Sequence, residues 1–150
     1  MDTPTQTITI LIVLYKAITT IFADKSKLVT IPYIMSLHSF NGPAQPIRIG
    51  CKTIDQKKSL VHIIKFYTEG KKLNNPFYFE EYLEWFRYLC IDTPLKFFDI
   101  SYYEKLNWKK YDTYISYLNN DYEKIFLTFQ LNTYSKIEKS ALDSILKKFN

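Results

Sequence analysis

The chain has 150 residues, a formal net charge of +5, two cysteines and only three glycines. Its hydrophobic content of 47% and aromatic content of 17% are enough for a packed core, which excludes a disordered chain. Cys51 and Cys90 are too few for a disulfide framework, so we expect an intracellular protein, and the longest apolar run, at residues 8–15, is too short to cross a membrane.

The first third of the chain predicts a small sheet interrupted by a helix. Residues 7–14 begin with apolar and polar alternation, which is typical of a strand, and a short link to the next segment favours a hairpin. Pro32 fits the first turn of a helix that Asn41, Gly42 and Pro43 then end. The predicted elements are strands at 7–14 and 17–22, a helix at 30–40 and a third strand at 46–49.

The centre of the chain predicts two amphipathic helices. Thr53 and Gln56 have the spacing of a capping box, and Gly70 ends the helix that they begin. Its apolar stripe has the i, i+3, i+4, i+7 spacing of one helical face and consists of Leu60, Ile63, Ile64 and Tyr67. Asn75 and Pro76 open the next helix, whose stripe of the same spacing consists of Phe79, Tyr82, Leu83 and Phe86.

The remainder of the chain predicts further helices. Thr93 and Pro94 open one that carries Leu95, Phe98 and Tyr102, and two more follow from residue 111 onward. A second capping box starts the last of them and consists of Ser135 and Glu138. Strands gathered at the front of a chain and helices behind them indicate an α+β fold rather than an alternating parallel sheet.

Taken in order, these segments resemble the S-phase kinase-associated protein family, the BTB/POZ-fold adaptors of cullin-type SCF ubiquitin ligases. The resemblance is carried by residues 29–31 with Ile34 and Met35, residues 46–49 with Leu60, Ile63 and Ile64, residues 88–91 with Leu95, and residues 123–131 with Ser135 and Glu138. It implies a BTB/POZ-like domain at residues 1–105, in which helices cover a small three-stranded sheet, and a C-terminal helical extension at residues 106–150.

The resemblance also implies a function and its site residues. Members of the family are non-catalytic adaptors that link an F-box-like substrate receptor to a cullin-type scaffold, so we expect a protein of the ubiquitin–proteasome pathway in the cytoplasm and nucleus. The scaffold contact is expected at Arg87 and Tyr88. The receptor contacts are expected at Tyr122, Ile125, Phe126, Phe129, Leu131, Ile137 and Ile145.

The titratable residues do not indicate a catalytic site or a metal-binding site. His38 and His62 lack a partner at the spacing that a metal site or a catalytic base requires. The three carboxylates within residues 80–84 fall on the polar side of a helix, which favours a solvated face over paired catalytic acids. The chain contains no glycine-rich phosphate loop, Gly-x-Ser-x-Gly or Cys-x-x-Cys motif. We therefore expect no enzymatic activity, no cofactor and no metal.

Two alternatives to the adaptor stay open. One is a BTB-like interaction protein without cullin binding, such as a homodimer or a viral decoy. The other is a basic nucleic-acid-binding module, in which the aromatic residues of the tail would stack on the bases of a single strand. The lysines occur as pairs and no RNP-like motif is present, so we expect no nucleic-acid partner.

Overall fold

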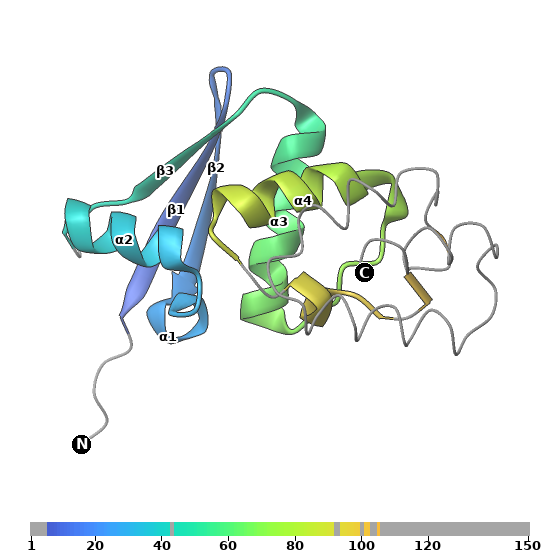
Figure 1. The fold of residues 1–150 in the computed structure, drawn as a ribbon. Helices are drawn as coiled ribbons and strands as arrows, with labels where there is room; N and C mark the ends of the chain where they lie inside the picture. The colour runs from blue at the N-terminus through green and yellow to red at the C-terminus, as the bar shows by residue number, and fades with distance from the viewer. Residues whose placement is uncertain (1–5, 43, 92–93, 100, 103–104, 106–150) are drawn as a thin grey trace, which may run out of the picture. The chain divides into compact units, whose positions relative to one another are not determined.

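The computed structural model of the protein describes residues 6–42, 44–91, 94–99, 101, 102 and 105. They form an α+β fold with a three-stranded mixed sheet and helices (Figure 1), as the sequence predicts. The chain divides into two compact units. The first contains the residues up to Lys71 together with Tyr88–Ile91, and the second contains Lys72–Arg87 together with the described residues beyond position 93.

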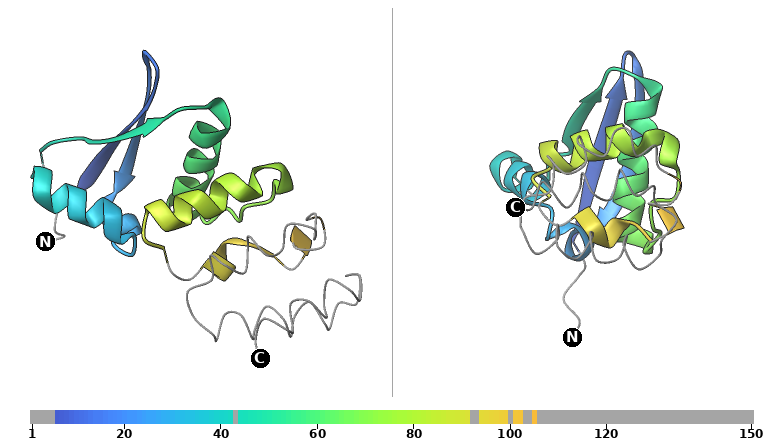
Figure 2. Two further views of the ribbon diagram at one scale, coloured as in Figure 1. Left: turned by 45° about the horizontal axis from the view of Figure 1, so that its top comes forward. Right: turned by 45° about the vertical axis from the view of Figure 1, so that its right-hand side comes forward.

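The sheet of the first unit has the strand order β2-β1-β3 (Figure 2). Strands β1 (Thr7–Leu14) and β2 (Ala17–Asp24) form an antiparallel hairpin. Strand β3 (Ile47–Cys51) pairs with β1 in parallel. All three predicted strands are therefore confirmed, and β2 continues two residues beyond its predicted end.

Alternation along β1 decides which face of the sheet is buried. Every second side chain of β1 is buried, namely Ile8, Ile10, Ile12 and Leu14. Successive side chains of a strand point to opposite faces, so this set shares one face with Ile47 and Ile49 of β3, which are also buried. Helix α3 contacts both of these strands, α2 contacts β3, and α1 contacts β2.

The hairpin turn consists of Tyr15 and Lys16 and contains no glycine. Tyr15 has a φ of 55°, whereas Lys16 is not among the residues with positive φ. Positive φ at the first central residue alone is the pattern of a type II′ turn, which suits the twist of the flanking strands and normally has glycine at that position. The predicted hairpin thus forms despite an unfavourable turn residue, because eight residue pairs hold the two strands together.

Two short helices connect the hairpin to β3. Helix α1 (Lys25–Leu28) is a single turn that no pattern in the sequence predicts, and it places Leu28 in the core. Helix α2 (Pro32–Asn41) begins with a proline in its first turn and ends at Gly42, whose φ is 89°. Both ends agree with the prediction, since proline suits the first turn and glycine tolerates the positive φ that follows a helix.

Helix α3 (Ile54–Glu69) has the capping box that the sequence predicts. Thr53 Oγ1 accepts a hydrogen bond from the Gln56 backbone N–H at 3.1 Å, and Gln56 Oε1 accepts one from the Lys52 N–H at 2.7 Å. The glutamine therefore binds one residue before the usual position of the motif. Of the predicted stripe, Leu60, Ile63 and Ile64 are fully buried, and Tyr67 is half-buried.

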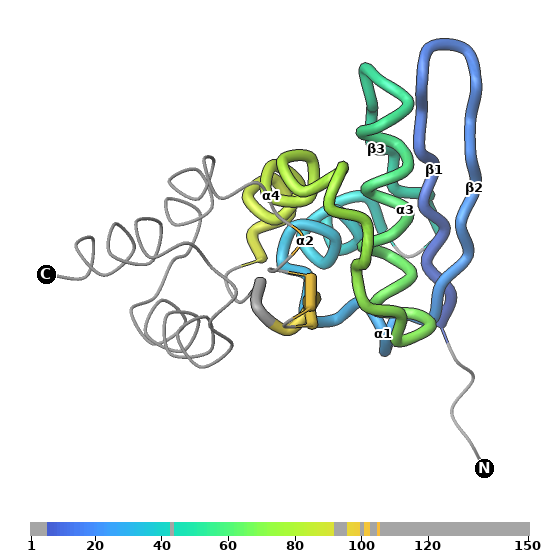
Figure 3. The backbone as a smooth tube through the Cα atoms, turned by 90° about the vertical axis from the view of Figure 1, so that its right-hand side faces the viewer, coloured from blue at the N-terminus to red at the C-terminus, as the bar shows by residue number. Residues whose placement is uncertain are grey.

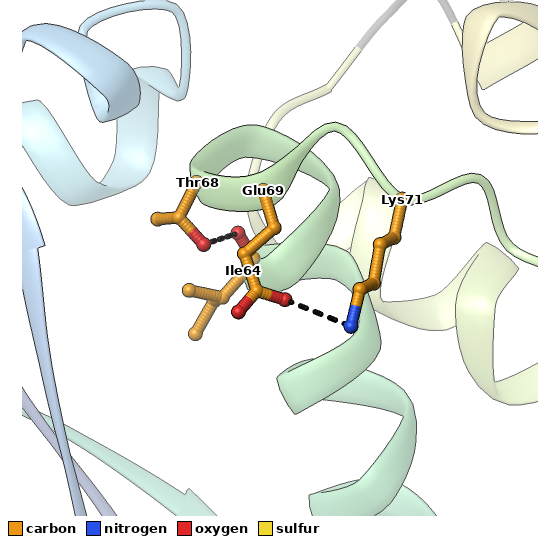
Figure 4. A network of polar contacts seen from close by, with 4 residues as sticks. All are labelled: Ile64, Thr68, Glu69 and Lys71. Atoms are coloured by element: carbon orange, nitrogen blue, oxygen red, sulfur yellow. Dashed lines mark hydrogen bonds and ion pairs between the residues drawn. The ribbon is translucent and has the colours of Figure 1, made fainter.

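The end of α3 is closed by local polar contacts (Figure 4). Gly70 adopts the left-handed conformation with a φ of 71°, and its N–H donates to the Phe66 carbonyl. Thr68 Oγ1 donates to the Ile64 carbonyl at 3.1 Å. Lys71 Nζ lies 3.5 Å from the Glu69 carboxylate, and both side chains are exposed, so this ion pair contributes little stability.

The second unit is built around aromatic side chains. It contains the 3₁₀ helix η1 (Pro76–Tyr78), most of helix α4 (Phe79–Tyr88) and the 3₁₀ helix η2 (Pro94–Phe97). Asn75 Oδ1 accepts a hydrogen bond from the Phe77 N–H at 2.9 Å, which confirms the predicted cap. The predicted stripe of α4 is buried throughout and consists of Phe79, Tyr82, Leu83 and Phe86.

Hydrogen bonds join the first described segment of this aromatic unit to the last one, and the Lys72 ammonium also donates to the Lys96 carbonyl. The Leu73 N–H donates to the Phe97 carbonyl at 2.9 Å, and the Tyr102 hydroxyl donates to the Asn75 carbonyl at 3.1 Å. The helix that was expected to run on from Thr93 is a 3₁₀ helix of four residues, after which Phe98 and Asp99 are not helical. The periodic stripe therefore misses Phe97, which is fully buried.

One predicted part of the chain is not covered by the structure. The predicted extension at residues 106–150 lies outside the described residues, so the boundary between residues 105 and 106 stays a prediction. Among the helices of the described residues, none combines the length and the apolar character that a membrane span requires.

Candidate protein-interaction surface

A pair of tyrosines lies where the sequence predicts a scaffold contact. Tyr33 is in the first turn of α2, and Tyr88 is the last residue of α4. Their hydroxyl oxygens are 2.7 Å apart, so one donates to the other, and their ring centroids are 4.6 Å apart. Tyr88 is nevertheless 47% exposed. This tyrosine pair, Tyr33 and Tyr88, therefore holds an aromatic ring in a defined position that remains accessible.

The backbone after α4 explains why Tyr88 stands at a helix end. Cys90 adopts a left-handed conformation with a φ of 59°, which reverses the chain without the glycine that usually ends a helix. The preceding Leu89 is fully buried, and its carbonyl accepts a hydrogen bond from the Tyr33 N–H at 3.4 Å. The buried leucine anchors the turn, and the Cys90 side chain is exposed beside it.

Tyr88 is a neutral group at physiological pH. The hydrogen bond with Tyr33 raises the pKa of Tyr88 to about 12, and partial burial and the neighbouring Tyr33 and Cys51 act in the same direction. Burial also raises the pKa of the Cys51 thiol, against a smaller opposing effect of Lys57. Tyr88 therefore offers a partner a hydroxyl and a ring face rather than a negative charge.

We expect Tyr33→Phe to lower the pKa of Tyr88 toward its ordinary value of about 10, because the substitution removes the hydrogen bond that stabilises the phenol. The raised pKa stabilises the folded state below about pH 10, and this stabilisation is lost as the pH rises toward 12. Near-ultraviolet absorbance measures the ionisation, and melting at a series of pH values measures the stability. Tyr15→Phe, at an exposed turn residue, should leave the Tyr88 titration unchanged.

The predicted scaffold residues occupy consecutive positions at the end of α4. Arg87 is exposed in the last turn of the helix, where a positive charge interacts favourably with the helix dipole. Tyr88 follows it as a member of the tyrosine pair. Their role in binding stays a prediction. The predicted receptor residues Tyr122, Ile125, Phe126, Phe129, Leu131, Ile137 and Ile145 lie outside the described residues.

The histidines and the carboxylates do not converge on a site within the described residues. His38 is buried, and its Nδ1 has no hydrogen-bond partner among them. His62 is half-buried on α3, and burial, together with Lys65 and Lys58, lowers its pKa, which keeps the ring neutral near pH 7. In the part of the chain that is described, no three histidine, cysteine or acidic side chains are grouped for metal binding.

A second accessible surface, which is not among the predicted site residues, lies on the hairpin. Ile18 and Phe22 of β2 are 53% and 71% exposed, although both are large and apolar. They share one face of the strand, and their cross-strand partners in β1 are Val13 and Thr9. The sequence signal for this surface is that Ile18 and Phe22 occupy alternate positions of the strand. When only one face of a sheet is buried, every second residue of a strand is left exposed.

Comparison of the chain with protein families, curated proteins and solved structures gives no match in any of the three.

Proposed function

We propose that the chain is a non-catalytic, BTB/POZ-like adaptor that links an F-box-like substrate receptor to a cullin-type scaffold. The observation that carries the proposal is the tyrosine pair. Tyr88 is held by Tyr33 and is still about half exposed, at the position that the resemblance assigns to the scaffold. A side chain that is already ordered loses little conformational freedom on binding, and tyrosine is frequent among the residues that dominate interface energies.

The order of the described elements supports the same proposal. Two strands, a helical segment, a third strand and two further helices follow one another, which is the order on which the resemblance was drawn. The order alone is common among α+β domains, so it adds weight only together with the residues of the tyrosine pair.

The proposed mechanism is positional rather than chemical. One surface at the end of α4 would bind the scaffold, and a second, formed by the predicted receptor residues between 122 and 145, would hold the receptor. A rigid body between the two partners would fix the distance of the substrate from the ligase. Such an adaptor would work in the cytoplasm and nucleus, where cullin-type scaffolds and their receptors would meet it.

Tyr88→Ala is expected to weaken cullin binding by about 2 kcal/mol, roughly 30-fold, because it removes the ordered ring. Binding of the F-box-like receptor should stay unchanged, and Phe129→Ala should produce the opposite pattern. Titration of each purified partner with each variant measures both affinities. Phe40→Ala is the matched control, since Phe40 is an aromatic residue of α2 that is 89% exposed.

Three outcomes would contradict parts of this proposal. If Tyr88→Ala abolishes both interactions and lowers the melting temperature, Tyr88 supports the fold rather than the scaffold contact. If the unmodified protein binds neither partner, the adaptor proposal fails and the BTB-like module without cullin binding takes its place. Retention on a nucleic-acid column that weakens steeply with salt would favour the basic module instead.

A further inference from the structure

Strand β2 is an edge strand of the sheet. It pairs with β1 on one side, and no described segment of its unit pairs with its other side. The strand order places β2 beside β1 and leaves its other side open, and Figure 3 shows β2 at the outer margin of the sheet. An edge strand presents a row of backbone N–H and C=O groups to solvent, which is a template for pairing with another strand.

The β2 edge has none of the features that usually prevent such pairing. It contains no proline, and its register with β1 is continuous from Ala17 to Asp24, so no bulge interrupts it. Its only charged residue, Asp24, is at the end. The opposite edge, β3, is shorter, carries the exposed Arg48 as its second residue and follows Pro46. The two edges of one sheet therefore differ, and among the described residues β2 is the edge that is open to a partner.

The hairpin geometry determines which residues of β2 can pair across the open edge. The two-residue turn is closed by the pair Leu14 and Ala17, and a pair of this kind exchanges both of its backbone hydrogen bonds. Hydrogen bonding alternates along an antiparallel ladder, so the odd-numbered residues of β2 bond to β1. The even-numbered residues, Ile18, Thr20 and Phe22, thus direct their N–H and C=O groups to the open edge.

We propose that β2 pairs with β2 of a second copy of this chain, antiparallel and about a two-fold axis that passes through Thr20. Thr20 then lies opposite Thr20 of the second copy, and Ile18 lies opposite Phe22. Both cross-strand pairs stabilise an antiparallel sheet: the two threonine hydroxyls can hydrogen-bond to each other, and the phenylalanine ring packs on the β-branched isoleucine. The two sheets join into one continuous six-stranded sheet, and Ile18 and Phe22, both more than half exposed, become partly covered.

Charge complementarity favours this register and favours a second copy of the chain as the partner. With the axis at Thr20, Lys16 of one copy lies opposite Asp24 of the other, and the pair occurs twice. Asp24 precedes α1 without a side-chain hydrogen bond to that helix, so its carboxylate is not used as a cap. Moving the axis to Ile21 places Ile18 opposite Asp24, and moving it to Thr19 places Lys16 opposite Phe22. Only the register about Thr20 pairs the opposite charges.

The first test is the mass of the protein by sedimentation equilibrium over a range of concentrations. The unmodified chain should form a dimer. Thr20→Pro should be monomeric with a circular dichroism spectrum like that of the unmodified chain, because it removes only an N–H that points to the open edge. Thr20→Val keeps that N–H and should remain a dimer. A monomeric unmodified chain, or a Thr20→Pro variant that still dimerises, would overturn the proposal.

The second test examines the register through charge reversal. Lys16→Glu and Asp24→Lys each place like charges opposite one another at two symmetric positions, so each should weaken the dimer about tenfold. The double variant restores opposite charges and should regain the affinity of the unmodified chain. If the double variant is weaker than both single variants, the strands do not pair in this register. Neither test involves a cullin or a receptor, so the result is independent of the proposed function.

Discussion

Phe98→Ala is expected to destabilise the second unit by about 3–5 kcal/mol, the range for truncating a buried phenylalanine. The Phe98 side chain is only 6% exposed and is the centre of the aromatic cluster. Its ring centroid lies 4.5 Å from that of Tyr102 and about 6 Å from those of Phe79, Tyr82 and Phe86. Alanine would leave a cavity that these large rings cannot collapse to fill.

Chemical denaturation followed by tryptophan fluorescence would measure this loss, because Trp85 is buried in the same unit. Phe77→Ala is the matched control. Phe77 is a phenylalanine of the same unit that is 73% exposed and contacts Tyr78 at a centroid distance of 5.3 Å. We expect it to cost no more than about 1 kcal/mol. Equal losses in the two variants would show that Phe98 is not central to the core.

Ile12→Ala is expected to destabilise the first unit by about 2–5 kcal/mol. Ile12 lies in the central strand of the sheet, with Thr19 of β2 and Ile49 of β3 as its neighbours in register, and it is fully buried. Its side chain thus contributes to the packing of the face against which α3 lies. Denaturant titration measures the free energy of unfolding of the variant and of the unmodified chain. If the m value is the same in both, the shift in the denaturation midpoint gives the loss of stability.

Val13→Ala, one residue further along the same strand, is the control for this experiment. Val13 points to the other face of the sheet and is half-buried, so its truncation should cost less than half as much. Because both residues are β-branched, the two substitutions change the strand propensity by similar amounts. A larger loss at Val13 than at Ile12 would mean that the buried face of the sheet has been assigned to the wrong side.

Local periodicity was sufficient to predict the elements that are buried on one face. The alternation in β1 and the stripes of α3 and α4 arise because a single face of each element enters a core, and that leaves a repeat in the sequence. Capping residues such as Thr53 and Asn75 then marked the beginnings of helices, since their side chains satisfy backbone groups close by.

Features that depend on distant or unfavourable residues could not be predicted in this way. Tyr88 was selected by resemblance alone, and its partner Tyr33 is 55 residues away, so no local pattern joins them. The turn at Tyr15 and the helix end at Cys90 have positive φ values without glycine, because surrounding packing outweighs local preference. Helix α1, a single turn, is too short for a periodic pattern to appear in it.

The parallel pairing of β1 with β3 implies an order of events when the chain folds. The hairpin of β1 and β2 is closed by a two-residue turn, and hairpins form in about 1–10 μs. Strand β3 can join β1 only after residues 15–46, with α1 and α2, have been brought back to the sheet, and closing such a long loop has an entropic cost. Docking of β3 should therefore be the slow step, during which both edges of the hairpin are exposed to other chains.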